Sequence, residues 1–169
     1  TSGVLGAATS ESFEVTPKLV ANALSAGSDF SCAVTVAGAA YCWGPSTSGQ
    51  LGDGGNSNHI RPVAVSGGLV FQAIETGFHH ACGLNTGRAA YCWGGNTWGQ
   101  LGDGTTTNRT SPVAVSGGLV FQFISSGGGH GCGFTTSGAG YCWGADDSGQ
   151  LGDGTTTNRT SPVAVSGGL

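Results

Sequence analysis

The feature that most constrains this chain of 169 residues is an internal repeat with a period of 50 residues. Trp43, Trp93 and Trp143 occupy the same position in three successive copies. The segment GQLGDGTTTNRTSPVAVSGG occurs unchanged at 99–118 and at 149–168. This period divides the chain into an N-terminal extension and three repeats: 1–18, 19–68, 69–118 and 119–169.

The composition restricts the repeat to one structural class. Glycine accounts for 34 residues, and charged residues make up only 8% of the chain. Helices on a protein surface need Glu, Lys, Arg, Leu and Ala in quantity, so a helical bundle is excluded. A hydrophobic content of 38% supplies a core and argues against disorder. The composition therefore favours an all-β fold with short strands and glycine-rich turns.

Each repeat contains the pattern of about four short strands, which is clearest in the second repeat. Alternating side chains predict a first strand over 69–76. A hairpin follows, with strands at 79–85 and 89–93 around the turn Thr86-Gly87-Arg88. A long loop then leads to a short strand at 112–115. Four antiparallel strands in about 50 residues predict one β-propeller blade per repeat.

The second repeat also carries a recognisable signature. The segment Tyr91–Asn96 followed by Trp98–Gly104, with His80 upstream and Pro112–Val115 downstream, resembles the regulator of chromosome condensation repeat. The resemblance extends over residues 19–169 and implies a β-propeller, which that family typically builds from seven blades. This chain supplies three. Nuclear members of the family are nucleotide-exchange factors that use a basic tail, and no such tail is present here, so we do not transfer that activity.

The cysteines occur as three pairs, each separated by nine residues, within the predicted hairpins. Opposed residues of an antiparallel hairpin have Cα atoms about 4.5–5.5 Å apart, which a disulfide can span. Zinc sites usually contain C-x2-C pairs, and this chain has none. Disulfides predict an extracellular or cell-surface location, whereas the alternative is buried free thiols in a cytosolic protein. The predicted pairs are Cys32–Cys42, Cys82–Cys92 and Cys132–Cys142.

Several functional classes are disfavoured. The net charge is −4 and the five basic residues are scattered, so no basic patch for nucleic acid is expected. No apolar run approaches the roughly 18 residues that a membrane-spanning helix needs. Asp53, Asp103 and Asp153 lie in Leu-Gly-Asp-Gly turns whose surroundings do not follow the calcium-loop pattern. Because no nucleophile, base or metal cluster recurs, we expect neither an enzyme nor a cofactor.

Two groups of repeated residues are expected to be structural. The three equivalent tryptophans should pack in the core between neighbouring blades. His80 and His130 share one repeat position, which Phe30 occupies in the first repeat. We expect these histidines to be hydrogen-bonded structural residues near the inner strands.

A few loop residues break the repeat and are candidates for binding a partner. Trp98 is the strongest, because Ser48 and Ser148 hold its position in the other repeats, and an exposed Trp can anchor a protein or a sugar ring. The other candidates for partner binding are Arg88, Asp146 and Asp147. Two sequons on long loops also predict N-glycosylation, at Asn108 and Asn158.

Three blades cannot close a ring, and open blade edges favour association. Segment Ser12-Phe13-Glu14-Val15 alternates like a strand and could pair with another chain's edge near Leu169. The sequence thus predicts a non-catalytic extracellular structural protein that self-assembles into a homo-oligomer or a head-to-tail filament. The alternative is a secreted protein-binding or inhibitory β-propeller module, or a fragment of a seven-bladed one, with another extracellular protein as its partner.

Overall fold

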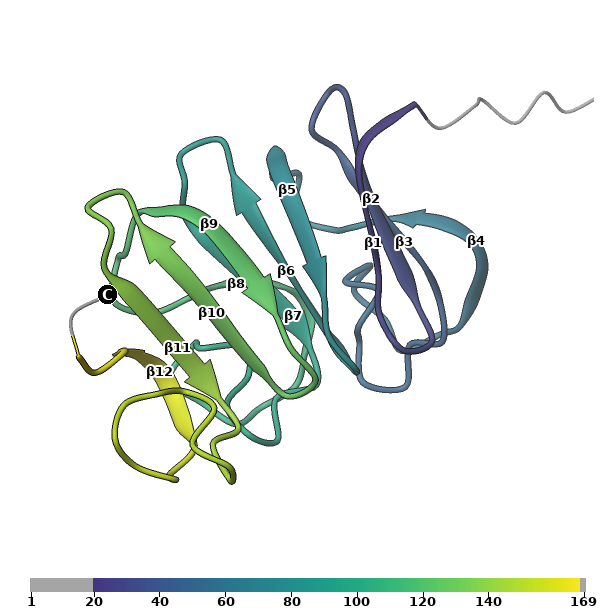
Figure 1. Cartoon of the computed structure of the whole chain (residues 1–169). Helices are drawn as coiled ribbons and strands as arrows, with labels where there is room; N and C mark the ends of the chain where they lie inside the picture. The colour runs from purple at the N-terminus through teal and green to yellow at the C-terminus, as the bar shows by residue number, and fades with distance from the viewer. Residues whose placement is uncertain (1–19, 168–169) are drawn as a thin grey trace, which may run out of the picture.

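The computed structural model describes residues 20–167, which form three four-stranded antiparallel sheets and no helix (Figure 1). The first sheet, blade 1, contains β1 (Ala21–Ala26), β2 (Ser31–Thr35), β3 (Ala40–Gly44) and β4 (His59–Ala64). Blade 2 contains β5 (Phe71–Thr76), β6 (His80–Asn85), β7 (Ala90–Gly94) and β8 (Arg109–Ala114). Blade 3 contains β9 (Phe121–Ser126), β10 (His130–Thr135), β11 (Gly140–Gly144) and β12 (Arg159–Ala164).

Each sheet takes its four strands in chain order from one repeat, so the predicted all-β blade architecture is confirmed. The blades stand side by side like part of a fan, with blade 2 in the middle (Figure 1). The first strand of each blade contacts the first strand of the next, β1 with β5 and β5 with β9. No helix that could cross a membrane occurs in the described part of the chain.

The strand boundaries differ slightly from the predicted ones, for reasons visible in the hydrogen bonds. β6 begins at His80, because the carbonyl of His79 instead accepts a hydrogen bond from the amide of Gly95 at 2.7 Å. β8 begins three residues earlier than predicted, because Arg109 pairs with Gly94 across a bulge.

The core lies between successive blades and depends on the repeated tryptophans. Trp93 and Trp143 are fully buried. Their indole Nε1 atoms donate to the carbonyls of Gln50 at 3.1 Å and Gln100 at 3.0 Å, each in the preceding blade. Trp43 is only half-buried, because the described residues supply no blade on that side. The expectation of a tryptophan between blades therefore holds for two of the three.

A glycine of the preceding blade makes room for each buried indole. Gly52 has a φ of +69°, and a Cβ atom added there would lie 2.6 Å from Nε1 of Trp93. Both the backbone conformation and the contact exclude a side chain, so the Leu-Gly-Asp-Gly turn is also a packing element.

Two of the predictions on self-association fall on residues for which the structure gives no description. The proposed donor strand, Ser12-Phe13-Glu14-Val15, and the terminal Leu169 both lie outside residues 20–167.

Candidate partner-binding site

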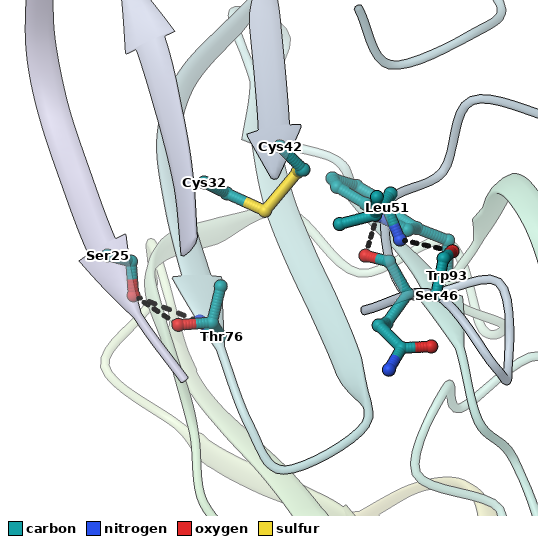
Figure 2. The surroundings of a disulfide bond; sticks show 8 residues. Ser25, Cys32, Cys42, Ser46, Leu51, Thr76 and Trp93 are labelled. Carbon is teal, nitrogen blue, oxygen red and sulfur yellow. Dashed lines mark hydrogen bonds between the residues drawn. A yellow bond between two sulfur atoms is a disulfide. The ribbon is translucent and has the colours of Figure 1, made fainter. Parts of the chain in front are cut away.

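The three predicted disulfides are present and stabilise the scaffold that carries the loops. Cys32–Cys42, Cys82–Cys92 and Cys132–Cys142 each join opposed residues of a hairpin, with Cα atoms 4.1 Å apart. Figure 2 shows the first of them between β2 and β3, close to the interface with blade 2. Cys32 and Cys42 are fully buried, so this bond is a structural cross-link rather than an exposed redox site.

Polar contacts between blades fix the loops at one end of the strands. Ser25 Oγ and Thr76 Oγ1 are 2.8 Å apart across the interface of blades 1 and 2 (Figure 2). In the adjoining loops, Ser28 Oγ donates to the carbonyl of Phe78 at 3.1 Å. The amide of Phe78 in turn donates to the carbonyl of Gly128 at 3.2 Å. A continuous chain of contacts thus connects the equivalent loops of all three blades.

Two exposed aromatic side chains lie at this end. Phe78 is 57% exposed and Trp98 is 40% exposed. A Cβ atom added at Gly128 would lie 3.3 Å from the ring of Phe78, and one added at Gly129 would lie 2.7 Å from the ring of Trp98. Both rings therefore rest on the glycine backbone of blade 3. We call Phe78, Trp98, Gly128 and Gly129 the aromatic patch.

Every residue of the aromatic patch departs from the repeat. Phe78 has Ser28 as its equivalent in blade 1, and Trp98 has serine in both other blades. Asp29 and His79 carry side chains where blade 3 has Gly129, so only blade 3 leaves space for an indole. Sequence reasoning identified Trp98 but missed Phe78 and the glycines. Comparing each residue with its equivalents 50 positions away would also have found Phe78 and the two glycines. The other blades fold with different residues at all four positions.

The other predicted partner-binding residues do not join this patch. Asp147 is exposed in the turn of blade 3 that corresponds to the turn of Trp98 in blade 2. Asp146 is completely buried, and its Oδ1 accepts a hydrogen bond from the amide of Leu151 at 2.9 Å. It cannot contact a partner, so its inclusion in the partner-binding group is wrong. Arg88 lies in the turn before β7, at the opposite end of the blade from Trp98.

Arg88 instead lines a cavity of about 280 Å³ between blades 2 and 3. This residue has a φ of 63°, which places a long cationic side chain in a left-handed turn. Burial raises the pKa of Glu75, which lines the same cavity. The other lining residues are Gln72, Ala73, Leu84, Gln122, Phe123 and Ile124.

His80 differs from the prediction of a hydrogen-bonded histidine. It is completely buried, and neither ring nitrogen has a hydrogen-bond partner. Burial, followed by the nearby charges of His130 and His79, lowers its pKa to about 4. Burial also lowers the pKa of His130, against an opposing effect of Asp146. Residues 20–167 contain no group of three His, Cys, Asp or Glu side chains placed to hold a metal ion.

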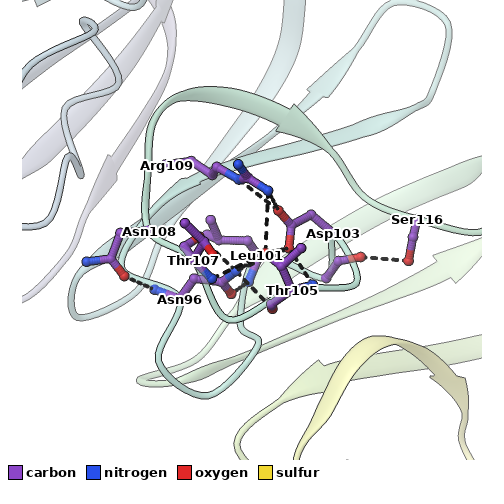
Figure 3. A network of polar contacts seen from close by, with 9 residues as sticks. Asn96, Leu101, Asp103, Thr105, Thr107, Asn108, Arg109 and Ser116 are labelled. Carbon is purple, nitrogen blue, oxygen red and sulfur yellow. Dashed lines mark hydrogen bonds and ion pairs between the residues drawn. The ribbon is translucent and has the colours of Figure 1, made fainter.

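The long loop of blade 2 is held by a buried polar network (Figure 3). Asp103 forms an ion pair with Arg109 at 2.7 Å and accepts hydrogen bonds from Thr105 and Asn96. Burial opposes the ionisation of Asp103, but the hydrogen bonds from Thr105, Arg109 and Asn96 outweigh it and lower the pKa. Blade 3 has the equivalent ion pair between Asp153 and Arg159, and blade 1 pairs Asp53 with His59 at 3.0 Å.

Both predicted glycosylation sites lie on these exposed loops. The Oδ1 atoms of Asn108 and Asn158 accept hydrogen bonds at 2.8 Å from the amides of residues 96 and 146, respectively. Their modification by sugar stays a prediction.

Comparison with known proteins agrees with this architecture. Two family models match the chain, and both describe the regulator of chromosome condensation (RCC1) repeat: one over residues 89–133 and 137–168, the other over 22–50. A search of curated protein sequences gives no significant match.

Solved structures with the same fold are larger than this chain. Human WBSCR16 superposes with a TM-score of 0.76 and 22% identity, and the match covers 85% of this chain and 37% of that one. Yeast RCC1 (Prp20) bound to Kap60 gives a TM-score of 0.74 with 19% identity, covering 85% of this chain and 36% of the other. A structure of Prp20p from Saccharomyces cerevisiae gives 0.74 and 19%, covering 85% and 38%. The chain thus spans little more than a third of the length of these structures.

Proposed function

Because the chain belongs to the RCC1 repeat family, we propose that it is a non-catalytic β-propeller module that binds a partner protein through the aromatic patch. Two structures of the same fold support a protein as the partner. One is yeast RCC1 (Prp20) in complex with Kap60, and the other describes the binding of Prp20p to Gsp1p and histones. The kind of partner that this chain binds is inferred below from its own loop residues.

The observation that carries the proposal is the pair of exposed rings at one end of the blades. Aromatic side chains dominate binding energy at protein interfaces, because they bury a large area and lose little conformational entropy. Phe78 and Trp98 come from different loops but rest on the same glycine backbone, so they present one preformed surface. Asp29, which follows Ser28 in the blade 1 loop that contacts Phe78, is exposed beside this surface. We infer that the partner offers an apolar pocket with basic residues at its rim.

An extracellular or cell-surface location is part of this proposal. Three disulfides persist in oxidising compartments and are rare in the cytosol. A module with one cross-link per blade suits a secreted binding protein, including an inhibitory one.

The test compares the intact, disulfide-bonded chain with variants in which one residue is replaced by its equivalent from another repeat. W98S and F78S each install the serine of blade 1, so the loop backbone is preserved. Purified extracellular proteins that the parent chain captures are assayed by calorimetry against both variants and against V36S, a control at another exposed apolar position. Each patch variant should weaken binding at least tenfold, and V36S should not. Equal affinity for all four chains would refute the proposal.

A second candidate function, self-assembly into an extracellular structural polymer or ring, is favoured by the outer faces of blades 1 and 3. Between blades, each buried indole donates to a glutamine carbonyl of its neighbour. Trp43 carries the corresponding indole on the outer face of blade 1, and Gln150 the corresponding carbonyl on that of blade 3. Two copies could therefore join head to tail by the contact already used inside the chain. Native mass spectrometry should then show oligomers that W43A removes, whereas a monomer at micromolar concentration would exclude this role.

A further inference from the structure

One position in the long loop of each blade differs in a way that changes the chemistry of its surroundings. This position holds Ser46 in blade 1, Asn96 in blade 2 and Asp146 in blade 3, and all three side chains are fully buried. In blade 2, Oδ1 of Asn96 accepts a hydrogen bond from the amide of Leu101 at 3.0 Å. Its Nδ2 group lies within hydrogen-bond distance of four oxygens: Asp103 Oδ1 at 3.1 Å, the carbonyl of Thr105 at 3.0 Å, the carbonyl of Thr107 at 3.1 Å and Thr105 Oγ1 at 3.3 Å (Figure 3).

Blade 3 builds the same loop around a carboxylate. Residues 149–168 are identical in sequence to 99–118. The Oδ1 of Asp146 accepts from the amide of Leu151 at 2.9 Å, as Asn96 does from Leu101. Thr155 Oγ1 donates to Asp153 Oδ1 at 2.7 Å, and the amide of Thr157 donates to Thr155 Oγ1 at 3.2 Å, the same distances as in blade 2. Oδ2 of Asp146 therefore occupies the place of the amide nitrogen.

This exchange replaces a hydrogen-bond donor with an acceptor. The nearest donor to Asp146 Oδ2 is the hydroxyl of Thr155 at 3.5 Å, and its single hydrogen is directed to Asp153 at 2.7 Å. From the equivalent contacts of Asn96 in blade 2, we infer that this oxygen lies opposite the Asp153 carboxylate and the main-chain carbonyls of Thr155 and Thr157, which are all acceptors. A fully buried, charged oxygen in such surroundings is costly unless a cation is coordinated there.

The charges of the loop lead to the same conclusion. In blade 2 the single carboxylate, Asp103, is balanced by Arg109. In blade 3 Arg159 contacts Oδ2 of Asp153 through both Nε and Nη2, and leaves Asp146 without a countercharge. His130 in β10 is the other titratable side chain that interacts with Asp146, and it lies outside this loop. The loop of blade 3 therefore places two buried carboxyl groups beside one arginine, whereas blade 2 has one of each.

We propose that blade 3 binds one calcium ion between Asp146, Asp153 and the main-chain carbonyls of Thr155 and Thr157. Calcium takes six to eight oxygen ligands at about 2.3–2.6 Å and tolerates irregular geometry, with water completing the shell. The Nδ2 atom of Asn96 lies 3.0–3.1 Å from three oxygens of the blade 2 loop, so a carboxylate oxygen in its place in blade 3 can share one ion with the equivalent oxygens. Magnesium demands a stricter octahedron and releases its water reluctantly, and zinc prefers nitrogen and sulfur ligands. This proposed site does not use the calcium-loop motif, which the Leu-Gly-Asp-Gly turns do not follow.

The repeat supplies a matched pair of variants for the test. The intact, disulfide-bonded chain is freed of metal with a chelator and titrated with CaCl₂ by calorimetry at pH 7.5, with MgCl₂ in a parallel titration. The parent chain should bind one calcium ion. D146N copies blade 2 and should bind none, whereas N96D copies blade 3 and should raise the stoichiometry to two. Calcium should also raise the melting temperature of the parent chain and leave that of D146N unchanged.

Several results would overturn the proposal. A folded parent chain that takes up no calcium, or a D146N variant that binds as the parent does, refutes it directly. If the parent chain takes up a proton on folding and binds no calcium, a proton rather than an ion lies between the oxygens of Asp146 and Asp153. That result also refutes the proposal. If N96D does not fold, the comparison of the parent chain with D146N still decides the question.

Discussion

Replacing His80 with Phe should make the protein less sensitive to acid between pH 7 and pH 5. His80 is completely buried without a hydrogen-bond partner on either ring nitrogen. Phe30 occupies the same position in blade 1 and is 2% exposed. In both blades the ring packs on the glycine that opens the loop, Gly27 or Gly77. A phenylalanine therefore fits this site and removes two unsatisfied polar atoms.

The size of the effect follows from the pKa of His80. Burial lowers this pKa from 6.5 to about 4, so the unfolded chain binds a proton more readily than the folded one. Stability from the neutral ring is then present above pH 6.5 and is lost as the pH falls toward the folded pKa. A difference of this size corresponds to about 2 kcal/mol of unfolding free energy between pH 7 and pH 5.

The assay is urea-induced unfolding of the parent chain and H80F at pH values from 5 to 7.5, with disulfides intact and ionic strength fixed. Asp103 and Asp153 have lowered pKa values, so their contribution to stability is lost only below about pH 4. Burial raises the pKa of Glu75, which changes stability with pH in the opposite sense. These groups and His130 are common to both chains, so the difference between the two curves reports His80.

Two outcomes would refute this reasoning. The first is parallel pH profiles for the two chains, which would mean that His80 ionises as easily in the folded state as in the unfolded one. The second is a large loss of stability in H80F at pH 7, which would show that the ring nitrogens have partners that stabilise the fold.

Three further predictions concern the scaffold and the aromatic patch. Replacing both Cys82 and Cys92 with Ala should lower the unfolding free energy by about 2–3 kcal/mol, measured in urea, because the bond closes a short loop of the unfolded chain. G52A should lower the unfolding free energy by more than about 2 kcal/mol and G54A by about 1 kcal/mol. Both glycines have positive φ, but only Gly52 contacts Trp93, so equal losses in the two variants would contradict the packing argument. G129A should displace Trp98, shift its fluorescence emission to the red and weaken partner binding, while G138A, where nothing lies within 4 Å, should leave both unchanged.

The fold could be predicted from the sequence because its determinants recur at fixed spacing. The separation of Cys82 from Cys92 and the turn between them set the hairpin register, and both residues are opposed in β6 and β7. The indole position likewise predicted the blade interface. Neither inference needed tertiary information beyond the 50-residue period.

The site was harder to predict because it depends on which neighbour in a loop points inward. Asp146 and Asp147 are adjacent and both break the repeat, yet the first is buried and the second exposed. The sequence does not report this difference, since the long loop is irregular and its inward-facing residues do not follow the two-residue alternation of a strand. The Asp103–Arg109 ion pair was missed for the same reason.

The placement of the disulfides has a consequence for oxidative folding. Six cysteines allow 15 pairings in principle. In each native pair the partners are separated by 10 positions, whereas neighbouring pairs are 40 positions apart in the chain. Because closing a shorter loop costs less entropy, each cysteine meets its native partner first. A newly duplicated repeat therefore carries both cysteines of its own disulfide. Adding repeats to the array lengthens it without creating a greater need for an isomerase to correct non-native disulfides.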